Sequence, residues 1–139
     1  PESFDQLAAF IFEGVGKDEV IGDFGTLGGG AAGWEIDRAD HALGTPRHAL
    51  IVAEATEFRA SYHWVKEEFN HSHSAIDGET CPFVRCDMMF FETPKGGAVF
   101  STSSISWAAS LAHKGYQNNV SRITANVVKR FIDPEPFEM

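Results

Sequence analysis

The chain has 139 residues, about the size of one domain, and carries 20 acidic against 11 basic side chains for a net charge of −9. Nucleic-acid binding needs a basic surface, so this charge excludes nucleic acid as an expected partner. An apolar fraction of 43% can supply a core, yet no apolar run approaches the about 20 residues of a membrane span. We therefore expect one folded domain or domain fragment over residues 1–139, with no membrane partner.

A helix pattern opens the chain. Ser3 and Gln6 form a capping box. Apolar residues then recur at helical spacing, at Phe4, Leu7, Phe10 and Ile11. Gly14 and Gly16 are expected to end this helix.

The middle of the chain favours extended structure. Residues 48–55, HALIVAEA, have the continuous aliphatic run of a buried strand, and residues 58–66 predict a second extended segment. GWEIDRA, residues 33–39, is a candidate short strand. The polar, turn-rich residues 67–82 indicate a surface loop.

The C-terminal half begins with a β-hairpin pattern. FVRCDMMFFET (residues 83–93) and AVFSTSSISW (residues 98–107) read as two strands around a PKGG turn. A helix is expected within residues 118–132, capped by Asn118 or Asn119. Its apolar face comprises Val120, Ile123, Val127, Val128 and Phe131. This order of elements indicates an α/β or α+β fold: a mixed β-sheet with a β-hairpin and flanking helices.

A glycine loop, GGGAAG, has the residue pattern of a nucleotide site. Gly28, Gly30 and Gly33 satisfy G-x-G-x-x-G, and Glu54 lies about where a ribose-binding acid is expected. The context is unfavourable, because GDFGT before the loop is a poor parallel strand and WEIDRAD after it is a poor helix. The carboxylates behind the loop would also repel a pyrophosphate, so we do not expect nucleotide binding.

Two other interpretations of the glycines remain open. They provide positive φ angles and close packing without a ligand, or they hold Glu35 or Asp37 in a sheltered position. In an extended segment, Glu35 and Asp37 would share one face. Desolvation beside Trp34 would raise the pKa of such a carboxylate, which would suit a general base near neutral pH.

Histidine and cysteine patterns are weaker. His71-x-His73 could form a metal pair on a strand, but it lies in the predicted loop with no evident third ligand, so solvated histidines are favoured. Cys81 and Cys86, the only cysteines, fit neither a zinc knuckle nor a disulfide framework. We expect Cys86 to be a buried free thiol in a reducing compartment.

His113 lies in SLAHKGYQNN, where a histidine, a tyrosine and two amides precede a predicted helix. Backbone N–H groups at a helix N-terminus favour anions and oxyanions, which would suit catalysis. The alternative is structural: an asparagine caps the helix, Tyr116 packs at its start and His113 is solvated.

Two long blocks resemble a known family. GDFGTLGGGAAGWEIDRAD and VRCDMMFFETPKGGAVFSTSSISWAASLAHKGYQNNVSRITANVVKRF are similar to the C-terminal part of the large (beta) subunit of the N,N-dimethylformamidase family. With the strand between them, the blocks span roughly residues 14–137. The resemblance implies an amidohydrolase that converts small N-alkylated formamides to formate and an amine. It also implies a mononuclear iron, held by two tyrosines and a glutamate in a glutamine-amidotransferase-like domain, that polarises the formyl oxygen and activates water.

The resemblance transfers to few residues of this chain. The iron ligands are expected upstream, so Tyr62 and Tyr116 are not assigned to iron, and the chain by itself is expected to bind none and to be inactive. Glu35 matches the auxiliary catalytic glutamate of the family. His113 and Asn118 match the family motif, which implies no role for them; His113 is the second catalytic candidate.

The implied partners are a small amide substrate, the remainder of the large subunit and a small subunit, in a cytoplasmic homo-oligomer. The alternative is a non-catalytic structural or oligomerisation module, whose glycine strip and C-terminal helix pack against other domains or copies. Exposed apolar area on an incomplete sheet would then drive self-association.

Overall fold

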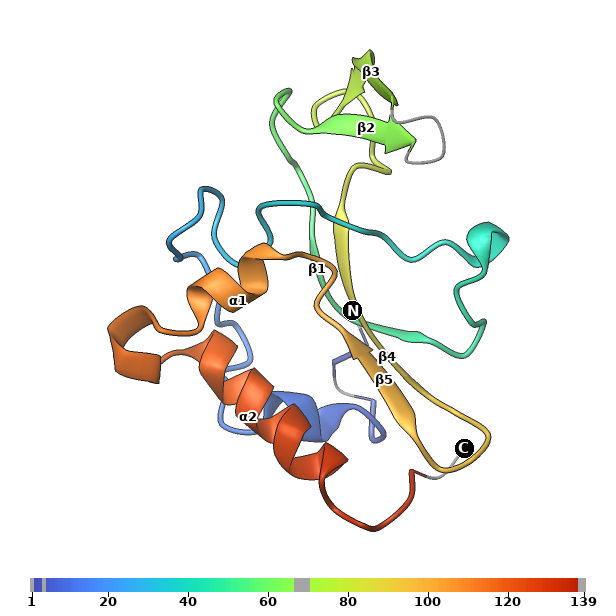
Figure 1. The fold of residues 1–139 in the computed structure, drawn as a ribbon, viewed down its shortest axis with the longest axis vertical. Coiled ribbons are helices and arrows are strands. Elements are labelled where there is room, and N and C mark those ends of the chain that lie inside the picture. The colour runs from blue at the N-terminus through green and yellow to red at the C-terminus, as the bar shows by residue number, and fades with distance from the viewer. Residues whose placement is uncertain (1, 4, 67–70, 138–139) are drawn as a thin grey trace.

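The computed structural model describes residues 2–3, 5–66 and 71–137, without the side chains of residues 66 and 71–74. Its main sheet is antiparallel and has three strands in the order β1-β4-β5. The strands are β1 (Leu50–Ala55), β4 (Cys86–Glu92) and β5 (Ala98–Ser101). Figure 1 shows α1 (Ser106–Ser110) and α2 (Asn119–Phe131) together on one side of this sheet. The expected mixed α/β architecture is confirmed.

The predicted hairpin is confirmed as β4 and β5, which pair in register from Met89–Ser101 to Glu92–Ala98. Its second strand is shorter than expected, because β5 ends at Ser101 and Ser106 begins helix α1 (Ser106–Ser110). The aliphatic run at 48–55 forms β1, which pairs with β4. Strand β4 lies in the centre of the sheet, in keeping with its apolar sequence.

A two-stranded antiparallel ribbon, β2 (His63–Lys66) and β3 (His71–Asp77), projects beyond the main sheet (Figure 1). β2 confirms the extended segment expected within 58–66. The predicted loop at 67–82 is wrong over residues 71–77. The polar sequence of β3 has no strand signal of its own, and its extended conformation comes from cross-strand pairing with β2.

The N-terminal helix prediction is largely wrong, because the segment forms turns and one short 3₁₀ helix, η1 (Ala9–Phe12). Asp5 accepts a hydrogen bond from the backbone N–H of Leu7, a local turn that competes with a helix. Ala8 and Ile11 are nevertheless fully buried. Their apolar spacing therefore reports burial rather than a long helix.

The C-terminal helix is confirmed as α2 (Asn119–Phe131), capped by the Asn118 side chain, which accepts from the Ser121 N–H. Val120, Ile123 and Val127 of the predicted apolar face are buried, whereas Val128 and Phe131 are exposed. None of the helices in the described ranges is long and apolar enough to cross a membrane.

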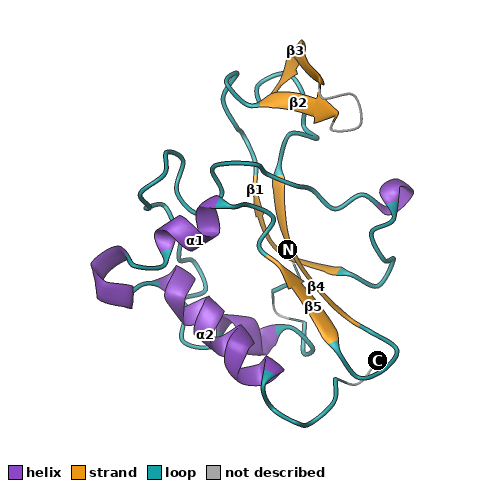
Figure 2. Ribbon diagram, in the orientation of Figure 1, coloured by secondary structure: helices purple, strands orange, loops and turns teal. Residues whose placement is uncertain are grey.

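The core draws most of its residues from the strands of the main sheet and from η1, α1 and α2, whose arrangement Figure 2 shows. Phe90 of β4 packs edge-on against Phe10 with ring centroids 5.5 Å apart, and Phe137 closes the cluster. The buried apolar members are Ala8, Ile11, Ala31, Val52, Met88, Phe90, Trp107, Val120, Ile123 and Val127. Each large member contributes about 1.5–3 kcal/mol through its burial. The core thus provides a rigid support for the loops described below.

Candidate functional site

The glycine loop is a packing element. A Cβ atom on Gly30 would collide with the carbonyl oxygen of Gly22, and one on Gly33 would lie 2.9 Å from Ser106 Oγ. Gly30 also has a φ of +76°. Residues 22–25 and 36–40 have no regular structure, so the strand and the helix of a dinucleotide fingerprint are both missing. The interpretation that these glycines permit positive φ and close packing is confirmed.

Directly after the loop runs the Glu35 strip, which we define as residues 34–39. Its first residue is held by serine hydroxyls: the Trp34 N–H donates to Ser106 Oγ at 2.8 Å. The Trp34 carbonyl accepts from Ser104 Oγ at 2.7 Å and from the Ile105 N–H at 3.2 Å. The strip is therefore fixed to the serine segment, residues 103–106, that leads into α1.

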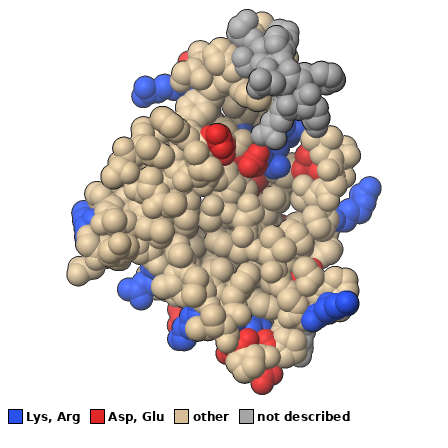
Figure 3. All heavy atoms as spheres, in the orientation of Figure 1, with Lys and Arg blue, Asp and Glu red and all other residues tan. Residues whose placement is uncertain are grey.

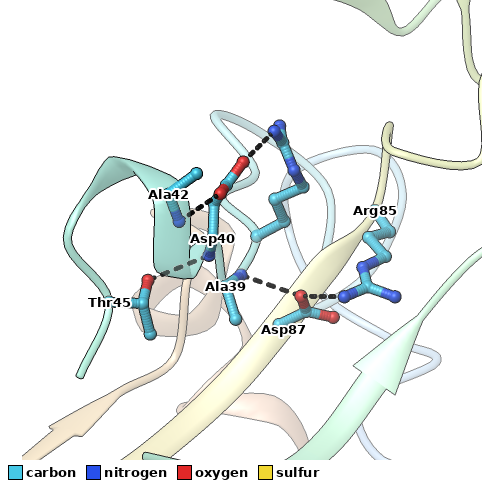
Figure 4. Close-up of polar contacts among 7 residues, drawn as sticks. Ala39, Asp40, Ala42, Thr45, Arg85 and Asp87 are labelled. Atoms are coloured by element: carbon cyan, nitrogen blue, oxygen red, sulfur yellow. Dashed lines mark hydrogen bonds and ion pairs between the residues drawn. The ribbon is translucent and has the colours of Figure 1, made fainter. Parts of the chain in front are cut away.

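The other side of the strip is fixed to strand β4. The Asp87 N–H donates to the Asp37 carbonyl at 3.0 Å, and the Ala39 N–H donates to Asp87 Oδ2 at 2.8 Å. Asp87 is fully buried and pairs with Arg85 at 3.0 Å, as Figure 4 shows. The strip thus lies between β4 and the serine segment.

The short strand predicted at 33–39 is wrong, because Glu35 has a left-handed backbone with φ +48° that interrupts the extended conformation. Ser103 on the facing segment is left-handed too, with φ +53°. Each such non-glycine residue costs of order 1–3 kcal/mol and persists only where its surroundings hold it; such residues cluster at functional sites. Here the flanking hydrogen bonds supply that constraint.

Glu35 and Asp37 are both exposed, so the expectation that the glycines shelter Glu35 is not met within the described residues. The strip lies on the surface, and Trp34, which was expected to desolvate a carboxylate, is itself 54% exposed. The carboxylates still interact: partial desolvation, followed by the charge of Glu35, raises the pKa of Asp37. The strip therefore presents two coupled carboxylates to the surroundings.

Cys86 lies beneath the strip as the expected buried free thiol and donates to the Ser103 carbonyl, with Sγ 3.2 Å from the oxygen. Burial, followed by the charges of Asp87 and Asp37, raises the pKa of Cys86 to about 12. The thiol stays protonated near neutral pH, so Cys86 acts here as a hydrogen-bond donor rather than a nucleophile.

His113 occupies a different place. Its ring stacks on Phe24 with centroids 4.2 Å apart, and it lines a pocket of about 340 Å³ beside the start of α2. Glu19 and Asp23 also line this pocket. Within the part of the chain that the structure describes, no hydrogen bond, ion pair or ring contact joins His113 to Glu35. The structure therefore brings Glu35 together with Asp37, not with His113.

The tyrosines do not complete a metal site with Glu35. Tyr62 packs on Phe58 with ring centroids 4.6 Å apart, and Tyr116 is exposed on the turn before α2. The resemblance implies that the iron ligands lie upstream, and neither tyrosine is assigned to iron here. The side chains of His71 and His73 lie outside the described part of the chain.

Sequence reasoning missed the residues that hold the strip, namely Asp87, Arg85 and the serines at 104 and 106. One signal for them existed. An aspartate within the apolar run CDMMFF is unusual, since buried carboxylates need a partner.

These features define a mixed α/β segment with a carboxylate-bearing surface strip, and comparison with known proteins places it further. Residues 3–119 match the family described as N,N-dimethylformamidase beta subunit-like, C-terminal. The N,N-dimethylformamidase beta subunits of Paracoccus aminophilus and Alcaligenes sp are each 46% identical to it over 136 residues. This alignment covers 98% of the chain and 18% of each relative. The chain belongs to the N,N-dimethylformamidase beta subunit-like family, and the resemblance of the sequence to that family is confirmed.

Proposed function

We propose that this chain is the C-terminal segment of an amidohydrolase that cleaves small N-substituted formamides to formate and an amine. The family membership supports this activity, because both similar proteins are named N,N-dimethylformamidase beta subunit. Since the chain spans only 18% of their length, the remaining parts of the site would come from outside it. We further propose that the chain forms the C-terminal part of a glutamine-amidotransferase-like domain. The complete large subunit would be cytoplasmic, would associate with further copies of itself and would bind a small subunit.

The proposed contribution of this chain is Glu35. Amide hydrolysis requires a proton to be taken from the attacking water and another to be given to the leaving amine, and a carboxylate can do both. The observation that carries this assignment is the strained backbone of Glu35, fixed on both sides and placed beside Asp37. Rigid placement matters because a general base must lie within hydrogen-bond reach of its proton.

An iron ion, held by residues outside this chain, would supply polarisation of the formyl oxygen. Glu35 would then act on the water, while Asp37 keeps negative charge near it. Docking of the upstream chain would desolvate the strip, which is exposed in the segment described here.

His113 is the second proposed catalytic residue. Its support is the pocket that it lines, next to the backbone N–H groups at the start of α2. The Phe24 ring fixes the orientation of its imidazole. Because His113 lies apart from Glu35, it would contact the substrate only if the upstream chain joins the two places.

The experiment compares Glu35→Gln with the wild-type sequence in the complete subunit, assayed on dimethylformamide. We expect kcat to fall about 10²–10⁴-fold, the usual contribution of general acid–base catalysis, with a small change in KM. An unchanged kcat would remove Glu35 from the mechanism.

A second candidate function is a structural or oligomerisation module. Several large apolar side chains are well exposed, among them Leu43 at 82% and Ile132 at 76%. Figure 3 shows that the face bearing α1 and α2 has broad areas without charged side chains. Surfaces of this kind mark docking sites. Light scattering on the 139-residue chain decides: self-association supports this function, and a monomer at high concentration contradicts it.

A further inference from the structure

We propose that the buried Arg85–Asp87 ion pair is a positioning pair for Glu35, because it holds the strip against β4 and sets the charge beneath it. This inference rests on the function proposed for Glu35. Neither residue touches the substrate in this account, and both act through the backbone of the strip and through its electrostatic environment.

The burial of Asp87 requires an explanation. It is fully buried in the central strand, and its ion pair with Arg85 joins it to a side chain that is 30% exposed. Burying a carboxylate is costly even when it is paired, and an apolar residue at such a position often gives equal or greater stability. Stability by itself therefore gives no reason for this aspartate.

The hydrogen bonds of Asp87 supply the reason. The residue contacts the strip at two points, through its N–H to the Asp37 carbonyl and through Oδ2 to the Ala39 N–H. Arg85 binds the same Oδ2 atom and so fixes its orientation. Figure 4 shows the carboxylate directed from β4 toward Ala39, with the guanidinium on its other side. The side chain of Asp87 thus fixes the strip at Ala39, and its backbone N–H fixes the strip at Asp37, two residues from Glu35.

A second ion pair, between Arg38 of the strip and the residue just after it, does not have this geometry. Arg38 pairs with Asp40 and stacks on Trp64 at 4.5 Å, and among the described residues it makes no hydrogen bond or ion pair with β4. Asp40 caps its own short helix by accepting from the Ala42 N–H (Figure 4). The Arg38–Asp40 pair is therefore a matched control: it has similar charges nearby but no side-chain bond that joins the strip to the sheet.

The Arg85–Asp87 pair also has an electrostatic role that depends on its neutrality. Glu35 is the charge that raises the pKa of Asp37, and the Asp37 and Asp87 charges both raise the pKa of Cys86. On the β4 side, Asp87 binds the Asp37 carbonyl through its N–H and carries the ion pair with Arg85. Removing the Asp87 charge would leave an unpaired cation beneath the strip, which favours ionised carboxylates. Removing the Arg85 charge would leave an unpaired anion, which disfavours them. The two substitutions must therefore shift the ionisation of the strip carboxylates in opposite directions.

The test uses the complete subunit with its metal and measures the pH profile of kcat/KM for dimethylformamide hydrolysis. We expect the acidic limb to move to lower pH in Asp87→Asn and to higher pH in Arg85→Gln, by about half a unit to one unit. Arg85→Lys, which keeps the charge, should restore the wild-type limb. Asp40→Asn should leave the limb in place.

If the pair had only a structural role, both variants would lose activity at every pH. The acidic limb of the pH profile would then not move in opposite directions in the two variants. Ile123→Val, a mild core change far from the strip, shows what a loss of stability does to the profile. If Asp87→Asn does not fold, the shift in Arg85→Gln and its rescue by lysine decide the question, since Arg85 is partly exposed.

The failures of the two proposals are distinguishable. If Glu35→Gln is inactive while both pair variants keep the wild-type limb and kcat, the positioning pair is refuted and the function of Glu35 stands. If Glu35→Gln is fully active, the proposed function fails, and the positioning role fails with it.

Discussion

Asp37 donates its backbone N–H to the carbonyl oxygen of Ser103 across 2.9 Å, which joins the Glu35 strip to the serine segment. The same carbonyl also accepts the buried thiol of Cys86. Because Glu35 and Ser103 are both left-handed, two strained residues lie on adjoining segments, and a network of backbone and hydroxyl hydrogen bonds holds them. The fold thus holds the backbone of Glu35 in a strained conformation at the residue proposed to transfer protons.

Removing the strain at Glu35 should raise stability. Glu35→Gly places at φ +48° the residue that tolerates a left-handed backbone, whereas Glu35→Ala keeps the penalty. We expect the glycine variant to exceed the alanine variant by about 1–2 kcal/mol in free energy of unfolding. Urea denaturation followed by tryptophan fluorescence measures this difference. Equal stabilities would mean that Glu35 is not strained in the folded chain.

The glycine loop offers a matched pair of substitutions. Gly30→Ala must fit a Cβ against the Gly22 carbonyl at a positive φ, whereas a Cβ on Gly28 has nothing within 4 Å. We expect Gly30→Ala to lose about 2–4 kcal/mol of stability and Gly28→Ala to change it little. Thermal unfolding of both variants tests this. Similar melting temperatures would contradict the packing role of the loop.

The pKa of Asp37 is raised by desolvation and by the neighbouring Glu35 charge, so its ionisation opposes folding. The penalty is absent below the ordinary aspartate pKa of about 3.9 and grows as pH rises through the raised value. Asp37→Asn should therefore raise the melting temperature at pH 7, and the gain should vanish near pH 3.5 (about 0.4 units below the ordinary value). Glu35→Gln should act in the same direction but less, since Glu35 is the smaller cause. A gain for Asp37→Asn that does not depend on pH would contradict this electrostatic origin.

Substitutions at Phe24 and at His113 distinguish the role of the imidazole from that of the ring stacked on it. Phe24→Leu removes the aromatic contact and keeps the imidazole, and its loss of stability should be about 0.5–1.5 kcal/mol. His113→Gln should cost a similar amount. If His113 is catalytic in the complete subunit, kcat should fall much further in His113→Gln than in Phe24→Leu. Equal activities would leave His113 with a structural role only.

Patterns that persist over several residues were readable from the sequence. The apolar runs gave β1 and β4, the PKGG turn gave the hairpin, and Asn118 with its following stripe gave α2. In each case the local signal and the tertiary packing agree. The family resemblance was also readable, because its two motif blocks are long.

The failures have a common physical origin in contacts between distant segments. β3 depends on pairing with β2, and the turns at the N-terminus are held in a core that no local pattern shows. Next to Glu35, Trp34 is held by hydrogen bonds with Ser104 and Ser106, which lie 70 and 72 residues further along the chain. Periodicity suggested a strand there, but it cannot show that one residue is held left-handed.

The proposed role of Glu35 is proton transfer in formamide hydrolysis. Glu57 is a close control, since it is an exposed glutamate with a similar left-handed φ of +59° and lies outside the strip. The deciding measurement is the rate of formate release from dimethylformamide by the complete subunit carrying Glu35→Gln or Glu57→Gln. We predict that kcat falls about 10²–10⁴-fold in Glu35→Gln and stays at the wild-type value in Glu57→Gln. Wild-type kcat in Glu35→Gln would contradict it.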